Sequence, residues 1–113
     1  GYIAIRELME MEDRPTAVFL SNYEITMGAV IAMNETGIRF PEDVSVIGFD
    51  NLLLSQVIRP RLYMVVQPME EIAQAAAKLM LERLAGKDPD REKEPKQILL
   101  HTSILEGESV RAL

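Results

Sequence analysis

Two short apolar runs on either side of a helical stretch constrain the fold of this chain more than any other feature. Residues 16–20 (TAVFL) and 44–49 (VSVIGF) are largely apolar and are bounded by proline, serine, asparagine and aspartate. Runs of this kind are typical of strands buried on both faces of a parallel sheet. Residues 24–36 between them carry apolar side chains near helical period and end before Gly37, a common helix stop. Residues 16–49 therefore predict a strand, a crossover helix and a parallel strand.

Further elements extend this pattern in both directions along the chain. A helix is predicted over 3–11, and a third strand is predicted over 62–66. The most regular helical pattern covers 69–84, where apolar side chains recur on one face and two glutamates occupy the first turn. The predicted fold class is α/β, with a parallel sheet flanked by helices.

The last part of the sequence has weaker signals. A charged, proline-bearing loop is expected at 87–96. Short terminal strands are expected at 97–101 and 104–105.

The composition excludes the commonest catalytic and metal-binding arrangements. The chain has no cysteine, and His101 is its only histidine, which argues against thiolate chemistry, a histidine-rich metal cluster and an ordinary Ser-His-Asp triad. Twelve Lys and Arg against eighteen Asp and Glu give a net charge of -6, whereas a nucleic-acid surface is normally basic. We expect no enzyme activity, no metal and no cofactor. We also expect that this segment does not itself bind DNA. Apolar runs are too short to span a membrane and no secretory signal is visible, so a soluble piece is expected.

Polar side chains follow each predicted strand. Asn22 and Tyr23 come after the first strand, Asp50 and Asn51 after the second, and Gln67 after the third. Ligands of open parallel sheets bind outside the carboxyl ends of the strands. Carboxylates and amides can pair sugar hydroxyls, and the ring of Tyr23 could cover an apolar sugar face. We therefore predict that Asn22, Tyr23, Asp50 and Gln67 bind a hydroxyl-rich ligand.

Each of these residues also has a structural interpretation. Asn22 is a strong candidate for the N-cap of the following helix, and Asp50 could simply make a turn. Gln67 precedes Pro68 and is read more readily as structural. The glycines form no G-x-G-x-x-G pattern, which disfavours a dinucleotide site.

Three segments carry a family resemblance. They are PTAVFLSNYEITMGA (15–29), GIRFPEDVSVIGFDN (37–51) and PRLYMVVQPMEEI (60–72). Together they closely resemble the LacI/GalR family of transcription repressors, and the similarity extends over essentially the whole chain. The chain corresponds to the C-terminal third of that family. The resemblance implies part of a periplasmic-binding-protein-like (type I) module, in which two α/β subdomains bind a small molecule in the cleft between them.

The resemblance also implies a division of the chain. Residues 1–67 would form part of the C-terminal effector subdomain. Residues 68–102 would supply a helix and a strand to the other subdomain, and residues 103–113 would return to the first.

Residue roles follow from the same resemblance. Asn22 and Asp50 stand where the family commonly places effector contacts, and Gln67 stands at the crossover between subdomains. The family usually dimerises through this face, and the loop from Leu52 to Tyr63 is the candidate. The interface residues expected there are Leu52, Leu53, Val57 and Tyr63.

Three departures from the family pattern limit this transfer. Tyr23 replaces a common aspartate, so ligand contacts at this corner should differ. Tyr63 and Met64 replace a common threonine pair, which makes that strand more hydrophobic. Gly107 occupies the place of a frequent arginine, so no role is carried over for that arginine.

The expected function is effector sensing and dimerisation in a cytoplasmic bacterial repressor. The effector would be a sugar or sugar derivative, and operator DNA would be bound through an N-terminal head that family members carry upstream. One alternative is a sugar-binding component of a transport system with the same fold. An enzyme on a similar scaffold is disfavoured, because no base or nucleophile is visible near Asp50. A helix-turn-helix pattern or a signal peptide upstream would separate the first two.

Overall fold

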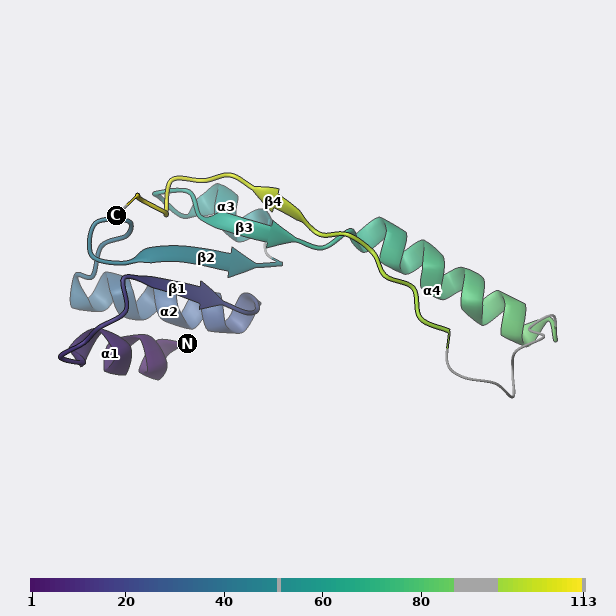
Figure 1. Ribbon diagram of the computed structural model, residues 1–113, viewed down its shortest axis with the longest axis horizontal. Helices are drawn as coiled ribbons and strands as arrows, with labels where there is room; N and C mark the ends of the chain where they lie inside the picture. The colour runs from purple at the N-terminus through teal and green to yellow at the C-terminus, as the bar shows by residue number, and fades with distance from the viewer. Residues whose placement is uncertain (51, 87–95, 113) are drawn as a thin grey trace. The chain divides into compact units, whose positions relative to one another are not determined.

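The computed structural model describes residues 1–50, 52–86 and 96–112 (Figure 1). Asn51 and most of the predicted charged loop, residues 87–95, lie outside the described residues. The chain divides into two compact units, one formed by Gly1–Val66 with Ser103–Leu113 and the other by Gln67–Thr102. The elements in chain order are α1 (Tyr2–Glu10), β1 (Ala17–Leu20), α2 (Tyr23–Thr36), β2 (Ser45–Phe49), α3 (Leu52–Val57), β3 (Tyr63–Val66), α4 (Met69–Leu84) and β4 (Ser103–Leu105).

The first unit is built on a four-stranded sheet with the order β1-β2-β3-β4. β1 pairs with β2 in parallel, with Ala17 opposite Ser45, and β2 pairs with β3 in parallel, with Ile47 opposite Tyr63. β4 adds antiparallel to β3. The three predicted parallel strands and the crossover helix between the first two are therefore confirmed, and the α/β fold class with them.

Helix α2 covers one face of this sheet and supplies much of the core. Its buried side chains include Ala29, Ala32 and Met33, as expected from the helical period of the sequence. They join Val46 of β2 and Met64 of β3 in one apolar cluster. The helix ends at Gly37, whose φ of 73° is the left-handed conformation expected of a glycine stop.

Helix α1 packs on α2 (Figure 1). Ile5 and Met9 are the buried residues of α1 and belong to the same apolar cluster. At the exposed side of the helix pair, the hydroxyl of Tyr2 donates a hydrogen bond to the Glu35 carboxylate. This bond raises the pKa of the Tyr2 phenol, because ionised tyrosine could no longer donate it.

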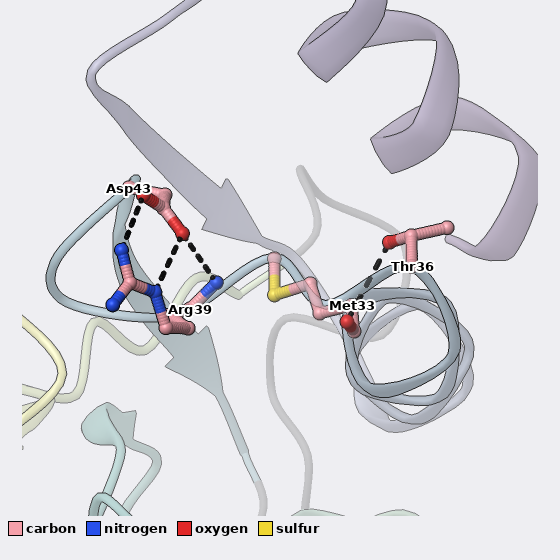
Figure 2. Close-up of polar contacts among 4 residues, drawn as sticks. All are labelled: Met33, Thr36, Arg39 and Asp43. Carbon is pink, nitrogen blue, oxygen red and sulfur yellow. Dashed lines mark hydrogen bonds and ion pairs between the residues drawn. The ribbon is translucent and has the colours of Figure 1, made fainter.

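An ion pair between Arg39 and Asp43 links the two ends of the turn between α2 and β2 (Figure 2). The Asp43 carboxylate accepts hydrogen bonds from the backbone N–H of Arg39 at 2.8 Å and from its Nε at 3.2 Å. Figure 2 also shows the Thr36 hydroxyl donating to the Met33 carbonyl in the last turn of α2, at 3.5 Å. The hydrogen bonds from Arg39 hold the pKa of Asp43 below its ordinary value. The turn therefore keeps this interaction until the pH falls through that lowered pKa.

The C-terminal tail contacts the amino ends of β2 and β3. Ser109 is completely buried there. Its hydroxyl donates to the Val46 carbonyl at 2.6 Å and accepts from the Tyr63 N–H at 2.8 Å. Its carbonyl accepts from the Val46 N–H at 2.8 Å. Gly107 fits beside this point because a Cβ there would lie 2.4 Å from the backbone carbonyl carbon of Leu62.

The second unit contains α4 and the segment 96–102. No residue of α4 is buried, although its apolar face matches the sequence prediction. Glu70 and Glu71 occupy the first turn as expected, where negative charge favours the helix dipole. Lys96 and Glu82 approach within 4.0 Å.

Three expectations about the elements are wrong. Residues 97–101 form no strand, and the terminal strand is Ser103–Leu105 alone. Residues 52–57, expected within a loop, form the short helix α3, because their apolar side chains lie at spacings that suit one helical turn. β1 is not buried on both faces, since Phe19 is 57% exposed. β1 is an edge strand, and its apolar sequence alone could not reveal that.

Candidate functional site

Asn22 and Tyr23 lie where β1 ends and α2 begins. Asn22 is the N-cap of α2, and its Oδ1 accepts a hydrogen bond from the Ile25 N–H at 2.9 Å. Its carbonyl also accepts from the buried Thr26 hydroxyl at 2.7 Å. Tyr23 is the first residue of the helix and is 53% exposed. The structural interpretation of Asn22 is therefore confirmed, while its side-chain amide nitrogen is not used by the cap.

Asp50 follows the carboxyl end of β2 and has an unusual backbone. Its φ of 62° makes it the one non-glycine residue with positive φ among the described residues. Its N–H donates to the Val65 carbonyl of β3 at 2.9 Å, which ties the turn to the next strand. Aspartate tolerates this conformation better than most residues, but glycine would adopt it without steric cost. The exposed carboxylate is thus held at the carboxyl edge of the sheet, at some cost to the backbone.

Gln67 directly follows β3 and is the first residue of the second unit. Its carbonyl accepts from the Met69 N–H at 2.9 Å, at the start of α4. Its side chain is half-buried. The structure therefore places Asn22, Tyr23 and Asp50 after two neighbouring strands of the first unit, and Gln67 at the junction with the second.

The side chains described at this edge of the sheet are polar. Within the described residues, no group of three or more His, Cys, Asp or Glu side chains could hold a metal ion. An apolar pocket of ≈ 350 Å³ lies elsewhere in the first unit, beneath α1, and none of the four predicted ligand residues lines it. No helix of the described part of the chain is long and apolar enough to cross a membrane. What the edge offers is a carboxylate, an amide and a phenol, which suit hydroxyl groups.

The predicted interface residues differ in their exposure and in the elements that carry them. Leu53 and Val57 of α3 are 76% and 78% exposed. Tyr63 lies in β3, half-buried, with its N–H bound by Ser109. Leu52 begins α3, and its side chain lies outside the described part of the structure. The candidate surface is therefore a helix rather than the loop expected from the sequence.

Sequence reasoning missed two positioning features near the candidate site. The Val65 carbonyl holds the backbone of Asp50, and Ser109 joins β2 to β3 from the far end of the chain. The positive φ of Asp50 had no signal in the sequence, since aspartate also suits ordinary turns. A buried serine in a polar tail gives no periodic pattern either.

Known proteins with similar sequences and structures point to one family. Residues 2–110 match the periplasmic binding protein-like domain family. The HTH-type transcriptional repressor PurR of Vibrio atlanticus is 41% identical over 98% of this chain and 32% of its own length. The chain thus spans about a third of the curated relatives it matches.

Solved structures of transcriptional regulators also resemble this chain. A LacI family transcriptional regulator from Enterococcus faecium with bound ribose has a TM-score of 0.79 at 34% identity, covering 100% of this chain and 40% of the other. The complex of the transcriptional regulator CelR with cellobiose has a TM-score of 0.81 at 30% identity, covering 96% of this chain and 32% of the other. The chain therefore belongs to the periplasmic binding protein-like domain family, in the form that LacI/GalR-type transcriptional regulators carry.

Proposed function

We propose that this chain is part of the effector-sensing module of a LacI-type transcriptional regulator, with a carbohydrate as the effector. The observation that carries the proposal is Asp50, a carboxylate kept at the ligand edge of the sheet in a backbone conformation that glycine would adopt more easily. The relatives support it, since one similar regulator has bound ribose and another is complexed with cellobiose. No catalytic role is proposed, and the working compartment would be the cytoplasm, where operator DNA is found.

In this proposal each predicted ligand residue has a defined contribution. The Asp50 carboxylate accepts hydrogen bonds from two sugar hydroxyls. The Asn22 amide nitrogen donates to a third hydroxyl, because only its Oδ1 is occupied by the helix cap. Tyr23 covers an apolar face of the ring, and Gln67 contributes from the junction with the second unit. Residues 68–102 belong to the other subdomain, and the opening angle between subdomains transmits binding to the DNA-binding head.

The test uses the polypeptide at the full length of the relatives, titrated calorimetrically with ribose and with cellobiose. We expect Asp50→Gly to weaken binding of the recognised sugar about 10- to 100-fold, because charge-assisted hydrogen bonds are lost. Glycine is chosen because alanine would add backbone strain at the positive φ of this position.

The matched control is Glu42→Gln, which removes an exposed carboxylate just before β2. Its affinity should equal that of the parent. Unchanged affinity in Asp50→Gly would remove Asp50 from the site. A parent that binds neither sugar would show that the sugars bound by these two relatives are not its effector.

We propose that DNA binding resides in the part of the longer polypeptide that this chain does not span. The present chain carries a net charge of -6, and phosphate contacts require clustered Lys and Arg. In a mobility-shift assay with operator DNA, we expect retention by the full-length polypeptide and none by the present chain. Sequence-specific retention by the present chain alone would overturn this assignment.

We also propose that α3 forms part of a homodimer interface, with Leu52, Leu53 and Val57 as contacts and Tyr63 at its margin. Leu53 and Val57 are exposed and four residues apart, which places them on one face of the helix, and contiguous exposed apolar surface marks interaction sites. In the full-length polypeptide, Leu53→Glu with Val57→Glu should convert dimers to monomers in sedimentation experiments. Gln56→Glu, on the same helix, is the control and should stay dimeric.

A further inference from the structure

Thr26 is a completely buried polar residue near the start of α2, four positions after Asn22. Its hydroxyl donates a hydrogen bond to the Asn22 carbonyl at 2.7 Å. Its backbone N–H donates to the same carbonyl at 3.0 Å. Thr26 therefore supplies two hydrogen bonds to one oxygen of the N-cap residue.

Asn22 depends on such contacts for its orientation, because it lies at the margin of the helix. Its φ of -161° and ψ of 177° are extended rather than helical, so α2 holds it from one side. Thr26, by contrast, belongs to the packed interior between α2 and β2. A Cβ on Gly48 of β2 would lie 3.8 Å from the Thr26 methyl carbon, which is van der Waals contact. The hydrogen bonds of Thr26 therefore tie Asn22 to the core.

Thr36 makes the same kind of bond at the other end of α2. Its hydroxyl donates to the Ala32 carbonyl at 2.7 Å. Threonine commonly bonds in this way to the carbonyl four residues earlier in a helix, and the bond alone implies no function. The acceptors differ. Ala32 lies inside α2 and has no polar side chain, whereas Asn22 ends the helix and carries an amide nitrogen that the cap does not use.

We propose that Thr26 is a positioning residue for effector binding, acting through Asn22. The proposal rests on the proposed function, because it requires the Asn22 amide nitrogen to meet the effector. Thr26 holds the backbone of Asn22, and the Ile25 N–H holds its Oδ1 at 2.9 Å. With both ends fixed, the amide nitrogen keeps one direction and loses little conformational freedom when it donates to a ligand.

Two substitutions of Thr26 separate positioning from simple packing. Thr26→Val removes the hydroxyl and keeps an apolar branch in the core, whereas Thr26→Ser keeps the hydroxyl and loses the methyl group. In the full-length polypeptide titrated with ribose and with cellobiose, Thr26→Val should weaken binding of the recognised sugar about 3- to 10-fold. Thr26→Ser should bind within about 2-fold of the parent, although its melting temperature should be the lower of the two because a buried methyl group is lost.

The matched control is Thr36→Val, which removes the equivalent bond far from Asn22 and should leave the affinity unchanged. Affinities that follow the melting temperatures, with Thr26→Ser the weakest binder, would show that Thr26 is only structural. Parental affinity in Thr26→Val, when Asp50→Gly weakens binding, would overturn this proposal and leave the proposed function standing.

Hydrogen exchange without any ligand gives a second measurement on the same polypeptides. The Ile25 amide donates to the Asn22 side chain, so its exchange rate reports how firmly that side chain is held. It should exchange about 3- to 10-fold faster in Thr26→Val and at the parental rate in Thr26→Ser and Thr36→Val. If neither sugar binds, the proposed function fails, and the Ile25 exchange decides whether Thr26 positions Asn22. Equal Ile25 exchange in all four polypeptides would overturn the positioning role.

Discussion

Replacing Ser109 by alanine should lower the free energy of unfolding of the present chain by about 2 to 4 kcal/mol. The hydroxyl is completely buried and serves two backbone groups at once, the Val46 carbonyl and the Tyr63 N–H. Alanine would leave the buried Val46 carbonyl and the part-buried Tyr63 N–H without that partner, at a cost of roughly 1 to 3 kcal/mol for a fully buried group. Since a domain of this size is stable by only about 5 to 15 kcal/mol, the loss is large.

Urea denaturation followed by circular dichroism measures this difference. Ser103→Ala is the matched control, because it removes the same hydroxyl from an exposed position in β4 and should change the stability by no more than about 0.5 kcal/mol. If Ser109→Ala unfolds like this control, water replaces the hydroxyl and the tail does not join the two strands.

The elements that sequence reasoning placed correctly are those with a strong local pattern. The run 16–20 and the helix ending before Gly37 are defined by composition, period and a glycine stop, and all three act locally. The errors concern tertiary context. The exposure of Phe19 depends on what lies beside β1, and α3 is too short for its helical period to be told from a loop.

The candidate site likewise combines features that the local sequence predicts with features that depend on tertiary structure. Strand topology predicted that Asn22 and Asp50 follow neighbouring strands, and the structure places them there. Asn22 caps α2 through its Oδ1. Its amide nitrogen is a separate group, so the same residue can cap the helix and donate a hydrogen bond to a ligand. The left-handed Asp50 donates a backbone hydrogen bond to the Val65 carbonyl, fifteen residues later, a pairing that no local pattern encodes.

The apolar face of α4 should make the present chain self-associate. None of the residues of α4 is buried, and Leu84 is 79% exposed. Other large apolar side chains of the helix that are exposed are Met69, Ile72, Met80 and Leu81. Each would gain about 1 to 3 kcal/mol by burial, and a helix of this length without tertiary packing is only marginally stable in water. A second copy can supply the missing surface, through side-by-side packing of helices or exchange of α4.

Light scattering across a dilution series gives the direct measurement, with apparent mass falling toward that of one chain as the concentration decreases. Met80→Glu combined with Leu84→Glu should give a monomer at every concentration, because both substitutions place charge on the exposed apolar face. Gln74→Glu adds a charge on the polar side of the same helix and should associate like the parent. These variants differ from those in α3, so association through α4 is separable from the proposed homodimer. A parent chain that stays monomeric, with the α4 amides protected from exchange, would mean that the helix packs on its own chain and that its apolar face needs no partner.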